Sequence, residues 1–278
     1  MRLGALLLVP ALLLSGCSGG EEPAGPTEVV AASYPFAWLA SQVACADARV
    51  VNLVKPGVEP HDLELTPRQV ADVRSADLVV HLAGFQPAVD DALEDTPALD
   101  LGLLKDKGSD DPHIWLDPVR MRTAALAVTD RLVELDPDHA EGYRTRGRAL
   151  LSSLEQLDGT FRGALRSCAR KELVTSHAAF GYLAARYGLV QHGISGLSPD
   201  AEPSPADLAS VVRFAKQHRV TTIFFETLVD PAVARTVAGE VGARTAVLDP
   251  VESVRGSDDY LTVMRRNAAA LHDALGCA

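Results

Sequence analysis

Short, continuously apolar segments alternate with longer segments of helical spacing along most of the chain. Such runs are typical of parallel strands that are buried on both faces, whereas strands with one wet face alternate strictly between apolar and polar residues. Strands joined by helices predict an α/β fold of parallel sheets flanked by helices. Strands are expected at residues 28–33, 49–54, 77–82, 98–101, 172–176, 190–194, 220–225 and 245–248, and shorter helices at 36–45, from 66 onward, 86–93, 180–187, 204–218, 231–241 and 258–275.

The middle of the chain has a different pattern. Residues 121–135 have helical spacing, Asp136-Pro137 interrupts it, and residues 138–165 form a second long helical stretch. At ~1.5 Å per residue this stretch spans roughly 40 Å, enough to run the height of a molecule with two lobes. Glycines at 142, 147, 159 and 163 argue against an uninterrupted helix.

This alternation predicts two α/β lobes, each a mostly parallel sheet with flanking helices. The expected boundaries are 28–135 for the N-terminal lobe, 136–166 for one long joining helix and 167–278 for the C-terminal lobe. No second apolar segment after the N-terminus is long enough to span a bilayer.

The N-terminus has the features of an export signal. Residues 1–16 contain Arg2 and then an apolar run at 6–14 that is too short for a transmembrane helix. Leu14-Ser15-Gly16-Cys17 matches a lipobox, which predicts cleavage before Cys17 and a lipid on its sulfur. The alternative is an ordinary signal peptide with a chance cysteine. Residues 17–27 are polar and rich in Gly and Pro, as expected of a flexible tether.

The net charge of the 278-residue chain is −11. An acidic surface argues against nucleic acid as a partner and attracts cations at long range. The sequence also has no Gly-rich phosphate-binding loop.

Three cysteines remain after Cys17: Cys45, Cys168 and Cys277. An exported chain lies in an oxidising compartment, where disulfides persist. Our hypothesis is that Cys168 and Cys277 pair and attach the last helix to its lobe. Cys45 is expected to be a small buried apolar residue, and its pairing across the lobes is the alternative.

Four residues stand out as metal-ligand candidates: His61, His113, His177 and Asp249. Each lies just after a predicted strand or in a Pro-flanked loop, and open parallel sheets place ligands at the carboxyl ends of their strands. Three imidazoles and one carboxylate complete a tetrahedral shell for zinc. Two candidates belong to each lobe, which predicts a single site between the lobes.

The remaining histidines have simpler interpretations. His81 lies inside a predicted strand and is expected to be packed, and His192 is ambiguous. His139, His218 and His272 lie on helices among polar residues, which indicates solvated surface.

Two further residues are candidates for supporting roles. Glu226 ends a strand and could ligate a metal, orient a ligand histidine or cap a helix, and we favour orientation. Trp115 could shield the site from water or be part of the core.

Four segments carry a family resemblance: residues 60–67 (PHDLELTP), 111–118 (DPHIWLDP), 176–180 (SHAAF) and 248–250 (LDP). In this order after a lipobox, they resemble the metal-binding lipoproteins of zinc/manganese ABC transporters, the ZnuA/TroA-like family of solute-binding proteins, and its zinc branch in particular. The resemblance implies a rigid joining helix and a metal held between the lobes by the four candidates. It also implies docking of the loaded protein, a monomer, on a membrane permease at the outer face of the plasma membrane.

The resemblance also bears on the choice of metal. Manganese binders of this family carry a carboxylate at the third ligand position, where this chain has His177, and imidazole favours zinc over harder ions. Zinc-branch members often have a His-rich loop before the second ligand motif, but residues 105–111 form a short segment without histidine.

These features predict a protein that captures Zn²⁺ as cargo and is not an enzyme. Four protein ligands leave no open position for a substrate, whereas catalytic zinc keeps one. Since the ligating imidazoles must be neutral, affinity is expected to fall below a pH of ~6.5. The alternatives are a manganese-binding member of the family, a surface adhesin on the same scaffold, and a zinc hydrolase with Asp249 or Glu226 as base. A His-Glu-x-x-His helix motif is absent from the sequence.

Overall fold

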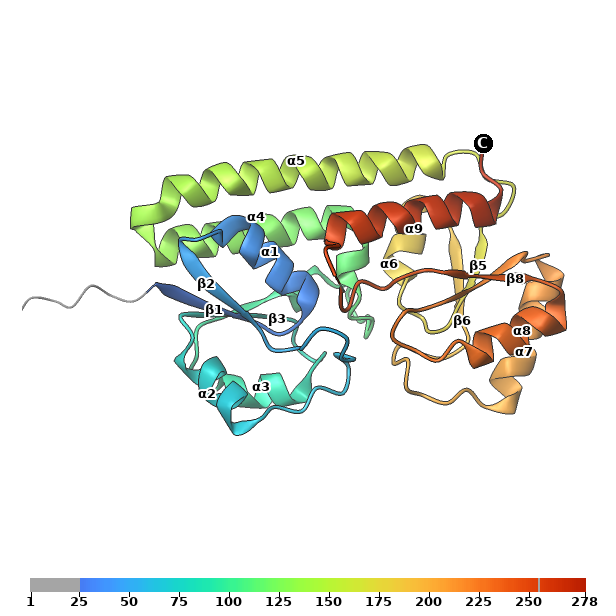
Figure 1. Ribbon diagram of the computed structural model, residues 1–278, viewed down its shortest axis with the longest axis horizontal. Coiled ribbons are helices and arrows are strands. Elements are labelled where there is room, and N and C mark those ends of the chain that lie inside the picture. Colours follow the sequence, from blue (N-terminus) through green and yellow to red (C-terminus); the bar gives the residue numbers. More distant parts are fainter. Residues whose placement is uncertain (1–25, 255) are drawn as a thin grey trace, which may run out of the picture.

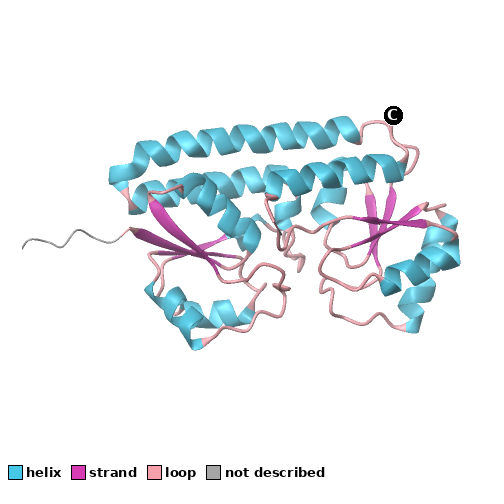
Figure 2. Ribbon diagram, in the orientation of Figure 1, coloured by secondary structure: helices cyan, strands magenta, loops and turns pink. Residues whose placement is uncertain are grey.

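Two four-stranded sheets lie side by side beneath a layer of long helices (Figure 1). The computed structural model describes residues 26–254 and 256–278. The predicted signal peptide, Cys17 and the tether up to residue 25 lie outside the described residues. Helices cover both sheets, and loops from the two lobes meet between them (Figure 2). The predicted α/β fold with two lobes of parallel sheet is therefore confirmed.

The first sheet has the strand order β2-β1-β3-β4, with every pair parallel. Val30 of the central strand pairs with Val51 and Val79. Neighbouring side chains of this strand enter different cores, because Val29 packs toward the central helices and Val30 toward α2 and α3. The strands are β1 (Thr27–Ala31), β2 (Ala48–Asn52), β3 (Leu78–His81) and β4 (Ala98–Asp100).

The second sheet repeats this topology, with the order β6-β5-β7-β8 and parallel pairs. The carboxyl ends of its strands carry loops toward the first lobe, which is where an open parallel sheet places ligands. The strands are β5 (Glu172–Thr175), β6 (Val190–Gly193), β7 (Thr222–Phe225) and β8 (Arg244–Val247).

Some of the shorter helices begin where the sequence supplies a capping side chain. Thr66 and Ser204 each accept a hydrogen bond from the third residue of the following helix, and Pro occupies the first helical position in both cases. These helices are α1 (Tyr34–Ala44), α2 (Pro67–Ser75), α3 (Pro87–Leu93), α6 (Gly181–Tyr187), α7 (Pro205–Gln217), α8 (Ala232–Val241) and α9 (Tyr260–Leu275), with short 3₁₀ turns η1 (Leu101–Leu104), η2 (Ile114–Leu116) and η3 (Pro137–His139).

Two long helices pack against each other, and the second of them extends over both lobes (Figure 1). Helix α4 (Pro118–Leu135) begins three residues before the predicted start, because the Asp117 side chain accepts the backbone N–H of Val119 and caps it. Helix α5 (Ala140–Ala164) has 25 residues and continues through all four of its glycines. A Cβ at Gly147 would lie 2.6 Å from Thr129 Oγ1, so this glycine permits the close packing of α4 on α5. Within the described residues, no helix combines the length and apolar character that crossing a membrane requires.

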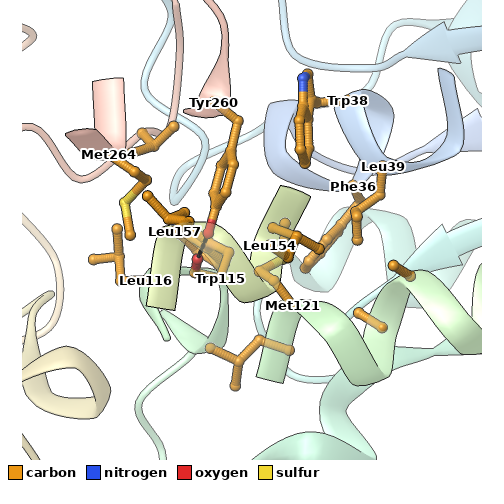
Figure 3. Close-up of a cluster of buried hydrophobic side chains, with 14 of the residues drawn as sticks. Phe36, Trp38, Leu39, Trp115, Leu116, Met121, Leu154, Leu157, Tyr260 and Met264 are labelled. Atoms are coloured by element: carbon orange, nitrogen blue, oxygen red, sulfur yellow. Dashed lines mark hydrogen bonds between the residues drawn. The ribbon is translucent and has the colours of Figure 1, made fainter. Parts of the chain in front are cut away.

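One hydrophobic core is shared by the two lobes (Figure 3). It contains side chains from the first lobe, from α5 and from α9. Trp38 of α1 stacks on Tyr260 of α9 with ring centroids 4.6 Å apart, and the Tyr260 hydroxyl donates to the carbonyl oxygen of Trp115 at 2.5 Å. Leu154 and Leu157 of α5 are fully buried beside them. The helices therefore fix the lobes to each other over a broad apolar contact.

The structure contains the predicted disulfide between Cys168 and Cys277. It joins the segment after α5 to the residue after Gly276, at the end of α9. Backbone hydrogen bonds from Ala169 to Gly276 and from Ala278 to Ser167 run alongside it. The expectation for Cys45 was wrong: this residue is free and exposed. It ends α1 with φ +53°, a conformation that turns the chain back toward β2 and leaves the thiol outside the core.

Replacing both Cys168 and Cys277 by serine is expected to lower the free energy of unfolding by about 2–4 kcal/mol, since the bond closes a long loop. The two cysteines are 109 residues apart. Zinc affinity is expected to stay unchanged, because the bond lies at the far end of α9. Denaturant unfolding under non-reducing conditions measures the loss, with Cys45→Ser as the matched control. Equal stability of the double variant and the wild type would contradict the prediction.

Candidate metal centre

The three predicted histidines come together from both lobes. His61 lies in the loop after β2, and His113 lies between η1 and η2 in the first lobe. His177 follows β5 of the second lobe by two residues. His113 and His177 are fully buried, and the side chain of His61 is 9% exposed. The strand ends of the two lobes therefore deliver their imidazoles to one enclosed point.

The fourth donor of this cluster is Glu252, and not the predicted Asp249. The atoms of His61, His113, His177 and Glu252 that could bind a metal all lie within 4.8 Å of one another. The carboxylate of Asp249 is engaged elsewhere, since it accepts hydrogen bonds from the Val251 N–H at 2.8 Å and from the Thr227 hydroxyl at 2.9 Å. The turn after Asp249 carries Glu252 into the cluster instead.

Five of the six separations between the four donors lie between 3.2 and 3.7 Å. The Nε2 atom of His113 lies 3.2 Å from that of His61 and 3.3 Å from that of His177. Glu252 Oε1 lies 3.3 Å from the Nε2 of His61 and of His113, and 3.7 Å from that of His177. Zinc–nitrogen bonds of ~2.0–2.1 Å in a tetrahedron require donor separations of about 3.3–3.4 Å. The cluster therefore has the dimensions of a zinc shell.

Two carboxylates hold the far sides of the imidazoles. Asp111 Oδ1 lies 2.7 Å from His113 Nδ1 and also accepts the backbone N–H of His113. Glu226 Oε2 lies 2.7 Å from His177 Nδ1, and its Oε1 accepts the backbone N–H of His177. A carboxylate on Nδ1 leaves Nε2 as the metal-binding atom and fixes the ring plane. The His177 Nδ1 atom, however, has no hydrogen-bond partner of good geometry among the described residues, so the orienting role of Glu226 stays a prediction.

Trp115 lies between the site and the core. Its ring centroid is 5.1 Å from that of His113, and its side chain is fully buried. The indole N–H donates to the carbonyl oxygen of Pro250 at 2.7 Å, two residues before Glu252. Trp115 is thus a core residue in contact with His113, and its role in shielding the site from water stays a prediction.

The titratable groups of the cluster shift one another's pKa values. Burial alone would lower the pKa of the His113 ring, but Asp111 and Glu252 outweigh it and raise that pKa to about 9. Burial likewise disfavours the charged Glu252 carboxylate, but hydrogen bonds from His113 and His61 hold its pKa well below its usual range. Burial and the charge of Glu252 raise the pKa of neighbouring Glu59 to about 8. Glu252 therefore presents a negative charge to any cation that enters.

The other histidines lie outside the cluster. His81 is buried, as expected, and its ring lies 3.2 Å from Asp90 Oδ1. His192, which the sequence left ambiguous, stacks on Phe214 at 4.6 Å. The remaining three histidines contact other groups. His139 hydrogen-bonds to Asp136, and His272 hydrogen-bonds to the carbonyl oxygen of Ala164. His218 pairs with Glu172 and packs on the Phe214 ring.

Sequence reasoning missed two residues of this site. Glu252 could have been weighed beside Asp249, because both follow β8, but the conformation of the turn between them decides which one faces the histidines. Asp111 stands two residues before His113, and a carboxylate is a common hydrogen-bond partner for a ligand imidazole. The arrangement as a whole offers four converging donors and suits the retention of a divalent cation better than its use in catalysis.

Comparison with known proteins gives consistent matches. The family model described as zinc-uptake complex component A, periplasmic (ZnuA) matches residues 29–274. The high-affinity zinc uptake system protein ZnuA of Bacillus subtilis is 34% identical over 300 residues, which covers 97% of this chain and 94% of that protein.

Two solved structures extend the comparison. The Zn(II)-bound ZnuA-like domain of Streptococcus pneumoniae AdcA matches with a TM-score of 0.78 and 35% identity, over 90% of this chain and 99% of that domain. The whole AdcA lipoprotein is longer, and the chain spans 58% of it. The laminin-binding protein Lmb of Streptococcus agalactiae, described as bifunctional with adhesin and metal transporting activity, matches with a TM-score of 0.84 and 32% identity, over 90% of this chain and 99% of Lmb.

Proposed function

Since the chain belongs to the ZnuA family of zinc-uptake components, we propose that it binds Zn²⁺ through His61, His113, His177 and Glu252 and passes it to a membrane permease. The observation that carries this proposal is the convergence of three Nε2 atoms and one carboxylate oxygen from both lobes, with five of their six separations at 3.2–3.7 Å. Relatives of the chain are binding components of zinc uptake systems, so the chain is a binding protein and not an enzyme.

The donor set supports zinc as the cargo. Imidazole nitrogen binds zinc more strongly than manganese, which prefers carboxylate, carbonyl and water oxygens. Only one of the four clustered donors is an oxygen. The second oxygen of Glu252 is buried and has no hydrogen-bond partner among the described residues, as suits a carboxylate that turns toward a cation.

The location follows from the family and from the N-terminal motif. Relatives are periplasmic or lipoprotein zinc-binding proteins, which places the chain outside the cytoplasm. The finer proposal is that a lipid on Cys17 anchors a monomer to the outer face of the plasma membrane, next to the permease of an ABC transporter. In this proposal residues 1–16 are removed, and residues 17–27 supply the anchor and the tether.

Metal analysis of the purified protein, followed by competitive titration with zinc and manganese, tests the proposed cargo. We expect one zinc per chain and a zinc affinity at least ~100-fold above that for manganese, because three of the four donors are imidazoles. Equal affinities, or manganese bound in preference, would contradict the proposal. Zinc bound at more than one equivalent with no change in the His113 and His177 ring NMR signals would place the ion elsewhere.

A further inference from the structure

The turn that delivers Glu252 contains a strained residue. Val251 has φ +59°, in the left-handed region that β-branched side chains rarely adopt. Its side chain is fully buried. Such conformations persist only where the surrounding structure enforces them, and they cluster at functional sites.

Asp249 is the residue that holds this turn. Its Oδ1 accepts the N–H of Val251 at 2.8 Å, and its Oδ2 accepts the Thr227 hydroxyl at 2.9 Å. Asn267 of α9 binds both backbone groups of Asp249, with its side-chain oxygen on the N–H and its amide on the carbonyl oxygen. Asn267 thereby fixes Asp249 to α9, and Asp249 holds the backbone of Val251.

The other side of the turn is attached to the first lobe. The Trp115 indole donates to the carbonyl oxygen of Pro250, and the N–H of Gly57 donates to the Ser253 hydroxyl at 2.6 Å. Residues 249–253 therefore bridge the lobes, with Asp249 as the attachment to the second lobe and Glu252 beside the histidines. A shift in the backbone of Val251 would move Glu252 directly.

We propose that Asp249 is a positioning residue for metal binding, which holds the strained Val251 turn so that Glu252 meets the three imidazoles. This rests on the proposed function, because it assumes that Glu252 binds the ion. The role explains a carboxylate beside the site whose oxygens are both occupied by protein donors. In this proposal Asp249 positions the ligand turn and does not itself bind the metal.

Competitive zinc titration of three variants tests the proposal. Asp249→Ala removes the acceptor for the Val251 N–H and is expected to weaken zinc binding about 10–100-fold, as for other residues that orient ligands. Asp249→Asn keeps an acceptor oxygen on the same carbon and is expected to restore affinity to within about threefold of the wild type, since no charge on Asp249 is needed. Asp249→Ala/Val251→Gly is expected to bind zinc more tightly than Asp249→Ala, because glycine adopts positive φ without strain.

Thermal unfolding of the zinc-free variants separates positioning from a general loss of stability. Asp249 lines a cavity of about 460 Å³, so alanine leaves room for water and the fold is expected to survive. Lower stability of Asp249→Ala with unchanged zinc affinity would overturn the proposal. Loss of affinity in Asp249→Asn equal to that in Asp249→Ala would also overturn it and would indicate direct ligation. If the wild type itself binds no zinc, the proposed function fails, and the positioning role fails with it.

Discussion

Zinc affinity is expected to fall by at least ~100-fold when His177 is replaced by alanine, since residues that only orient ligands already account for 10–100-fold. His177 supplies one of four donors from a fully buried position, and the remaining three leave one zinc position to water, a weaker ligand. Alanine also leaves the Glu226 carboxylate buried without the imidazole that it contacts at 2.7 Å. Competition against a zinc-binding dye measures the loss.

His139→Ala is the matched control for this variant. His139 is half exposed and contacts Asp136, on the side of the molecule where α4 meets α5. Its replacement is expected to leave zinc affinity unchanged within about twofold, because surface substitutions away from a site rarely exceed ±0.5 kcal/mol. A His177→Ala variant that binds zinc as tightly as the control would remove His177 from the ligand set.

Replacing Glu252 by glutamine is expected to weaken zinc binding by at least ~100-fold, because a neutral amide is a poor zinc ligand and the charge of the site is lost. Glutamine keeps the size of the side chain, so packing is preserved. The Glu252 carboxylate carries the only negative charge among the four clustered donors. The same titration measures the effect, and zinc-free thermal unfolding verifies that the variant is folded.

Glu64→Gln is the matched control for Glu252→Gln. Glu64 is an exposed glutamate three residues after His61, so it adds charge near the site without reaching it. Its replacement is expected to change affinity by less than about twofold at physiological salt, where exposed charges are screened. If Glu252→Gln matched this control, the fourth donor would have to be sought elsewhere.

The strands could be predicted from short runs of apolar residues, which are typical of buried parallel strands. The central strands β1, β3 and β7 are mostly apolar and buried, whereas β6 (VQHG) and β8 (RTAV) are more polar; each strand of the described residues was still located to within two residues. Helix starts were less certain: Asp117-Pro118 both caps α4 and begins it, but apolar spacing becomes evident only from Met121. The glycines of α5 argued for an interrupted helix, but the helix is continuous. Gly147 is required there by the close packing against Thr129. Tertiary contact outweighs helix propensity at such positions.

The metal centre was predictable in its histidines and not in its carboxylate. Position after a strand points to His61 and His177 without knowledge of the turns that follow. Asp249 satisfies the same criterion, but a turn of unusual φ at Val251 directs Glu252, and not Asp249, to the imidazoles. Local sequence does not reveal a left-handed valine, because the energy that sustains it comes from α9 and from Trp115.

The apolar core that both lobes share is expected to limit how the site opens. Separating the lobes as rigid bodies would expose Trp38, Tyr260 and their neighbours to water, at about 25 cal/mol for every Å² of apolar surface. Rearranging the loops that carry His61 and Glu252 exposes far less. We therefore expect the residence time of the cargo to depend on the opening of these loops. A permease that separates them would accelerate dissociation without displacing the long helices.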